Sequence, residues 1–155
     1  MAIEKVIEYF TKLGAADKIK RFNISSATVE LAAEALGCDG AHIAKTMSFL
    51  VDSHAVLIVT AGDMKIDNAK FKAFFHTKAK MLTPEQVDEL VGHSIGGVCP
   101  FAVNEGCVTY LDESLKRFEI VYPAAGNAAS AIELTPAELE KYSLSLGWVD
   151  VCRPI

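Results

Sequence analysis

The sequence of 155 residues contains no apolar run long enough to cross a membrane. Its longest apolar stretches, residues 47–51 and 55–61, have the length of strands, whereas a membrane-spanning helix needs about 20 apolar residues. The N-terminal segment is amphipathic and carries acids, where a secretory signal peptide carries bases followed by a long apolar core. We therefore expect a cytoplasmic protein without a membrane partner.

The sequence also lacks any Cys-x-x-Cys pair. Its four cysteines, Cys38, Cys99, Cys107 and Cys152, are widely spaced. A zinc site built from His93, Cys99 and Cys107 matches no finger or ribbon spacing. In a reducing compartment, such cysteines are small buried side chains or free thiols. We therefore predict neither a metal nor a cofactor.

Basic residues are in the minority, because 15 lysines and arginines stand against 20 acids and give a net charge of −5. This balance argues against a protein that coats DNA or RNA without specificity. The bases are nevertheless gathered: five lysines between residues 65 and 80 accompany the single acid Asp67, and Lys18, Lys20 and Arg21 form a second group. Each group alone is typical of a solvated surface, but on one shared face the two could bind phosphates.

The apolar pattern predicts one α/β (α+β) domain over residues 1–155, with a mixed, mostly antiparallel sheet surrounded by helices. Helical spacing predicts helices over 2–13 and 28–36, the second with a serine cap. Alternation predicts a strand over 46–51, and the continuous apolar run 55–61 predicts a central strand buried on both faces. Further helices are expected after Asp67, Thr83-Pro84 and Thr135-Pro136, and short strands near 79–82, 108–111, 119–122, 131–134 and 148–151.

The segment Gly92-His93-Ser94-Ile95-Gly96 matches the Gly-x-Ser-x-Gly nucleophile elbow of serine hydrolases. That motif follows a strand, and its catalytic histidine comes later in the chain. Here a predicted helix precedes the motif, and no histidine follows His93. The α/β-hydrolase interpretation is therefore rejected.

Lys45 stands between the apolar pair Ile43-Ala44 and Met47, where a helical turn is expected to meet a strand. A lysine in this position can extend its ammonium to solvent along its apolar stem. It can equally be a desolvated ammonium with a lowered pKa that holds a carbonyl, a phosphate or a water in a cleft. Position alone leaves both interpretations open.

Cys99 lies in Val98-Cys99-Pro100, a setting also found around the reactive cysteine of peroxiredoxins. Those proteins place that cysteine at a helix N-terminus after a Pro-x-x-x-Thr/Ser sequence, which residues 94–98 do not supply. Reactivity also requires a lowered thiol pKa. A thiol peroxidase is therefore kept as a minor alternative.

The loop from Ser94 to Phe101 contains two adjacent glycines and a proline, so it presents backbone groups rather than side chains. Together with Lys45 and a later loop of small residues, it resembles the YbaK/EbsC family, which is related to the editing domain inserted in bacterial prolyl-tRNA synthetases. The matching segments, which span nearly the whole chain from about residue 22, are Thr28-Val29-Glu30-Leu31-Ala32-Ala33, Ile43-Ala44-Lys45-Thr46-Met47-Ser48-Phe49, Gly92 through Phe101, and Ala125-Gly126-Asn127 followed by Ala131 through Pro136.

Proteins of this family are trans-editing deacylases, which hydrolyse the ester that joins a wrong amino acid to the 3′ end of a tRNA. The resemblance implies that Lys45 is the essential catalytic lysine. The residues that it implies for substrate binding are Gly96, Gly97 and Pro100 in the loop, Gly126 and Asn127 opposite it, and Ser26 and Thr28 at the edge of the pocket.

The resemblance thus predicts a cofactor-free aminoacyl-tRNA deacylase that acts in trans on the acceptor end of a mischarged tRNA carrying a small amino acid. The tRNA for proline is a candidate substrate, prolyl-tRNA synthetase is a candidate partner, and the lysines between residues 65 and 80 are candidates for phosphate contacts. Alanine-specific relatives carry a histidine soon after the Gly-Asn loop, and this chain has none, so alanine, cysteine and serine all stay open. The alternative is a non-catalytic binder of aminoacyl-tRNA or of a small metabolite on the same scaffold.

Overall fold

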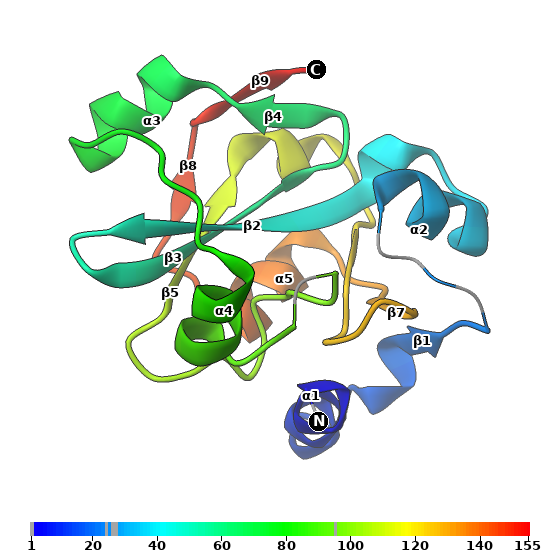
Figure 1. Ribbon diagram of the computed structural model, residues 1–155. Helices are drawn as coiled ribbons and strands as arrows, with labels where there is room; N and C mark the ends of the chain where they lie inside the picture. The colour runs from blue at the N-terminus through cyan, green and yellow to red at the C-terminus, as the bar shows by residue number, and fades with distance from the viewer. Residues whose placement is uncertain (1, 24, 26–27, 95) are drawn as a thin grey trace.

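A long antiparallel hairpin forms the centre of the computed structural model, which describes residues 2–23, 25, 28–94 and 96–155 (Figure 1). Its strands are β2 (Ile43–Val51) and β3 (His54–Ala61). They are joined by Asp52 and Ser53, which both adopt positive φ, as a two-residue turn of type I′ requires. β3 is almost wholly buried, so the predicted central strand is confirmed.

Three shorter strands complete a five-stranded mixed sheet in the order β6-β2-β3-β5-β8. β5 (Val108–Asp112) lies parallel to β3, and β8 (Trp148–Val149) lies parallel to β5. β6 (Tyr122–Pro123) is parallel to β2 but pairs only with its first two residues. Two antiparallel pairs flank the sheet: β1 (Ile19–Arg21) with β7 (Ser130–Ile132), and β4 (Met64–Ile66) with β9 (Cys152–Pro154).

Helices cover both faces of the sheet (Figure 1). The helices are α1 (Ala2–Lys12), α2 (Val29–Leu36), α3 (Asn68–Phe75), α4 (Pro84–Gln86) with the π-helical turn η3 (Val87–Val91), α5 (Pro136–Ser143), and the short 3₁₀ turns η1 (Ala16–Lys18), η2 (Gly40–His42) and η4 (Glu113–Arg117). α3 and the β4–β9 pair pack on one face through Phe71 and Cys152 against Phe49 and Ile58. α1, α5 and η4 pack on the other. No helix of the described part of the chain is both long and apolar enough to cross a bilayer.

Several predicted boundaries differ from the structure. Thr28 caps α2, accepting a hydrogen bond from Leu31 N, so the predicted serine cap is wrong. β2 begins at Ile43 rather than at residue 46, and the strand expected over 119–122 shrinks to β6. The strand expected over 79–82 is reduced to one bridge between Met81 and Phe49, and β9 was not predicted.

Candidate active site

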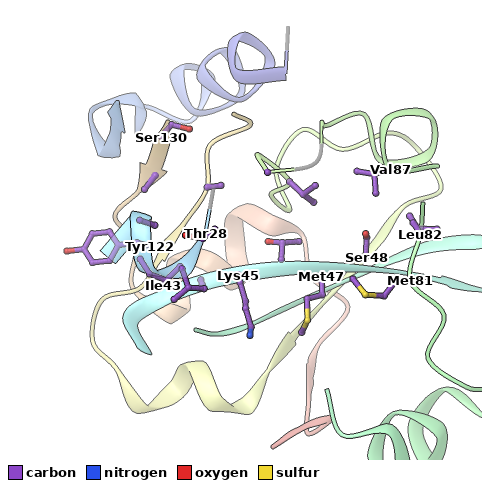
Figure 2. Close-up of a pocket in the computed structure, with 18 residues that line it drawn as sticks. Thr28, Ile43, Lys45, Met47, Ser48, Met81, Leu82, Val87, Tyr122 and Ser130 are labelled. Atoms are coloured by element: carbon purple, nitrogen blue, oxygen red, sulfur yellow. The ribbon is translucent and has the colours of Figure 1, made fainter. Parts of the chain in front are cut away.

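A cavity of about 210 Å³ opens along the edge of β2 (Figure 2). α2 closes one side, the segment between Met81 and Val98 closes another, and the start of β7 forms the end wall. Its lining comprises Thr28, Val29, Ala32, Ile43, Ala44, Lys45, Thr46, Met47, Ser48, Met81, Leu82, Val87, Gly96, Val98, Tyr122, Ala124, Ser130 and Ala131. Many of these side chains are small, so the cavity combines an apolar wall with a few polar groups, as ligand sites commonly do.

The edge of β2 is unpaired at one residue inside this cavity. In β2, the backbone N–H and C=O of Ala44 face β6. Further along the strand, the Ser48 carbonyl accepts a hydrogen bond from Leu82 N. Thr46 lies between them, and because backbone groups alternate along a strand, its N–H and C=O point to the same side. No described residue pairs with these two groups. The Thr46 hydroxyl is also buried without a hydrogen-bond partner among the described residues.

Lys45 is the third residue of β2 rather than the junction of a helical turn with the strand. Its side chain leaves β2 on the side opposite to Ser48, with the ammonium directed away from Leu82 and Val87 (Figure 2). Lys45 is half-buried, and its Nζ makes no hydrogen bond or ion pair with a described residue. Burial lowers the pKa of Lys45, although the nearby Cys152, Asp63 and Glu30 oppose this shift. Partial burial and the lowered pKa agree with the desolvated-ammonium interpretation.

The glycine loop and the late small-residue loop contact each other backbone to backbone. A Cβ atom added at Gly97 would lie 2.6 Å from Asn127 N and 2.7 Å from the carbonyl carbon of Gly126. The Asn127 carboxamide oxygen accepts a hydrogen bond from Ala129 N at 3.0 Å, so it stabilises its own turn. Gly97 thus allows the two loops to meet behind the cavity.

The structure brings only part of the predicted site together. Thr28, Lys45 and Gly96 line the cavity, and Gly97, Gly126 and Asn127 form the loop contact behind it. Pro100 is buried and lines a separate cavity beside Tyr9 and Tyr142 rather than this one. Ser26 lies outside the described residues.

Sequence reasoning missed Thr46, Ser48 and Ser130. The Ser130 hydroxyl accepts from Ala125 N at 3.3 Å and donates to the Asn127 carbonyl at 3.4 Å, which holds the second loop at the end of the cavity. The alternation of β2 places Thr46 and Ser48 on one face, but the open edge exists only because β6 ends at Pro123. The sequence predicts a strand end at residue 122, next to Pro123, but it does not indicate that this strand pairs with β2.

Cys99 is fully buried beside His93, with Sγ 3.5 Å from Nε2. That Nε2 donates to the Phe101 carbonyl at 2.8 Å, and burial raises the pKa of the Cys99 thiol to about 12. A thiol held protonated in this way does not fit the thiol-peroxidase alternative. Among the described residues, no three His, Cys, Asp or Glu side chains are grouped so that they could hold a metal ion.

Alkylation should distinguish these cysteines. With a pKa of about 12, a fraction on the order of 10⁻⁴ of the Cys99 thiol is ionised at pH 8. We expect iodoacetamide to modify the half-buried Cys38 in the native protein and to reach Cys99 only after unfolding in urea. Peptide mapping by mass spectrometry measures both rates, and native labelling of Cys99 at the rate of Cys38 would contradict the assigned environment.

Comparison with known proteins agrees with the resemblance inferred from Lys45 and the glycine loop. The model of the aminoacyl-tRNA editing domain family matches residues 25–142. The uncharacterized protein YwhH of Bacillus subtilis (strain 168) is 49% identical over 99% of this chain and 98% of its own length. A proline–tRNA ligase of Leuconostoc citreum (strain KM20) is 31% identical over 64% of this chain, which corresponds to only 17% of the ligase.

Solved structures show the same fold. A crystal structure described as that of a candidate trans-editing enzyme for prolyl-tRNA synthetase superposes with a TM-score of 0.88 at 28% identity, over 98% of this chain and 97% of that one. The crystal structure of the hypothetical protein APE2540 superposes with a TM-score of 0.85 at 26% identity, over 96% of this chain and 99% of that one. Taken with the family match over most of its length, these similarities show that the chain belongs to the aminoacyl-tRNA editing domain family.

Proposed function

We propose that this protein is a deacylase that hydrolyses, in trans, the ester between a small amino acid and the 3′ end of a mischarged tRNA. The observation that carries this proposal is the cavity at the open edge of β2, where the unpaired Thr46 adjoins the half-buried Lys45. Membership of the editing-domain family supports the reaction class. The similarity to a candidate trans-editing enzyme supports action in trans.

The unpaired groups of Thr46 match the chemistry of an aminoacyl group. The α-amino group of such a substrate is a donor, and its ester carbonyl is an acceptor. The Thr46 C=O can accept from the amino group while the Thr46 N–H donates to the carbonyl, as an added strand would pair with a sheet edge. The buried Thr46 hydroxyl gains a partner in the same complex, which removes the cost of leaving it unsatisfied.

Hydrolysis of an aminoacyl ester requires no strong protein nucleophile, because the ester is already activated. A positioned water, a polarised carbonyl and fixed geometry suffice, and the neighbouring hydroxyl of the terminal ribose can assist. Lys45 supplies the positive charge. Its ammonium has no hydrogen-bond or ion-pair partner among the described residues, so it is free to turn toward an ester held at the strand edge.

The cavity has room for a small amino acid. Its volume is about 210 Å³, and Ala32, Ala44, Ala124, Ala131 and Gly96 leave space close to the strand edge. Alanine, cysteine and serine are the candidates. The similarity to part of a proline–tRNA ligase makes the tRNA for proline the first tRNA to test, and prolyl-tRNA synthetase the first protein partner.

Release of amino acid from a panel of charged tRNAs tests the proposal. Alanyl, cysteinyl and seryl esters would each be presented on the cognate tRNA and on the tRNA for proline, with the uncatalysed loss of each ester as the baseline. We expect rapid release from at least one mischarged pair. Binding of tRNA without release from any pair would contradict the proposal and favour the non-catalytic binding protein.

A further inference from the structure

We infer that the outer face of α3 and the extended segment 78–82 form a binding surface for the acceptor strand of the RNA substrate, with Lys72 and Lys78 contacting backbone phosphates. This inference rests on the proposed function, because it assigns the path by which the esterified 3′ end reaches the cavity.

The charge of this surface is not neutralised. Lys65, Lys72, Lys78 and Lys80 are exposed, and none of them forms an ion pair with a described residue. Lys70 is different, because its ammonium contacts Asp150 at 3.0 Å and donates to the Cys152 carbonyl at 3.1 Å.

The two acids beside Lys70 are already engaged. Asp67 accepts hydrogen bonds from Ala69 N and Lys70 N at the start of α3, and Asp150 pairs with Lys70. The lysines of this surface therefore keep their charge available for an external anion, although the whole protein is acidic.

Lys72 and Lys78 also share a hollow. Together with Asn68, Ala69 and Ala79 they line a depression of about 460 Å³ on the outer face of α3. Two lysines that line one hollow suit a phosphodiester, because a lysine binds phosphate as a point charge and needs no fixed fork geometry.

The segment after Lys78 connects this hollow to the candidate active site. It runs extended beside β2, since Leu50 N donates to the Lys80 carbonyl and Leu82 N donates to the Ser48 carbonyl. The three residue steps from Lys78 to Met81 span about 10 Å in an extended chain. Met81 lines the cavity and is 61% exposed, so the rim between the two hollows is open to solvent. An RNA strand whose 3′ end enters the cavity would pass Lys78 within its first few nucleotides.

The second basic group is partly neutralised by acids. Lys18 pairs with Glu138 at 3.2 Å, and Lys20 lies 4.0 Å from Glu133. β1, which carries Lys20 and Arg21, lies beside α1, at the opposite end of the molecule from α3 (Figure 1). The two basic groups therefore do not share a face. The second group also adjoins the cavity, because Lys20 and Arg21 pair with Ala131 and Ser130 at its end wall, but Lys18 and Lys20 lie against acids, whereas the lysines around α3 do not.

Charge reversal tests the surface. The double variant Lys72→Glu/Lys78→Glu is compared with Lys12→Glu/Lys141→Glu, which changes the net charge equally at exposed positions on α1 and α5. Binding of uncharged tRNA is measured against salt concentration. We expect the slope of log Kd against log salt to fall by between about 1.4 and about 1.8 in the test variant, because each phosphate contact contributes about 0.7 for single strands and about 0.9 for duplexes. Binding at 0.1 M salt should weaken about 10-fold, and the control should stay within about twofold of the wild type.

Hydrolysis assays distinguish failure of the proposed RNA-binding surface from failure of the proposed deacylase function. The test variant should lose kcat/KM on an aminoacyl-tRNA but retain the wild-type rate on the corresponding aminoacyl-adenosine, which has no backbone phosphates. A salt slope equal to that of the control would overturn the proposed surface. If the proposed deacylase function is wrong, the wild type will hydrolyse neither aminoacyl-tRNA nor aminoacyl-adenosine. The salt slope will still show whether the surface binds RNA.

Discussion

Replacing Lys45 with methionine is expected to lower kcat/KM for a mischarged tRNA by about 100-fold or more, while tRNA binding stays within about threefold of the wild type. Methionine retains an unbranched apolar stem but removes the charge. Lys45 is the one cationic side chain among the described residues that line the cavity, so no neighbour can replace it in stabilising the developing oxyanion. Single-turnover release of amino acid measures the effect.

Stability provides the control for this variant. Burial lowers the pKa of Lys45 in the folded protein, so the charged form carries a folding cost at neutral pH that fades as the pH rises above the folded-state pKa. Lys45→Met removes this cost, and its Tm at pH 7 should be no lower than that of the wild type. Lys45→Arg keeps the charge with a different shape and should recover only part of the activity. Full activity in Lys45→Met would assign catalysis to the Thr46 edge alone.

Gly97→Ala should have the largest effect on stability. The added Cβ would overlap the backbone of Asn127 and Gly126, and backbone atoms cannot move aside as a flexible side chain can. We expect the free energy of unfolding to fall by about 3 kcal/mol, the upper part of the range for overpacked sites. Residual folded protein should also lose deacylase activity, because the loop that carries Gly96 would be displaced from the cavity.

Gly40→Ala is the matched control for that substitution. Its added Cβ would meet only the Val29 side chain, at 3.3 Å, which can shift by a few tenths of an ångström. Urea denaturation should therefore show a much smaller decrease in the free energy of unfolding for Gly40→Ala than for Gly97→Ala. Equal decreases would mean that the contact between the two loops is not rigid.

Elements with strong local signals could be predicted from the sequence. The side chain of Asp67 caps α3, and Thr83 and Thr135 form capping boxes at α4 and α5, as expected from the residues themselves. The continuous apolar run 55–61 became the buried strand β3. Thr28 replaced the expected serine as the cap of α2 because threonine and serine hydroxyls can both cap a helix, and sequence alone does not choose between neighbours.

Features that depend on distant contacts could not be predicted in this way. β9 forms because Cys152 and its neighbours pair with β4, and the sequence of β9 has no strand signal of its own. The role of Lys45 was inferred from family resemblance, whereas the open edge at Thr46 depends on where β6 stops. The family resemblance implies a substrate-binding role for Pro100, which stays a prediction; the structure buries its side chain in a cavity with Tyr9.

The unpaired edge of β2 also bears on solubility. An exposed strand edge usually invites pairing with a strand of another molecule, which leads to aggregation. Here β6 covers the edge up to Ala44, and the segment ending at Leu82 covers it from Ser48 onward, so the described residues leave only Thr46 uncovered. A peptide strand needs several consecutive residues to pair, whereas an aminoacyl group presents one donor and one acceptor. The length of the gap therefore suits the proposed aminoacyl substrate and is too short to pair with a polypeptide strand.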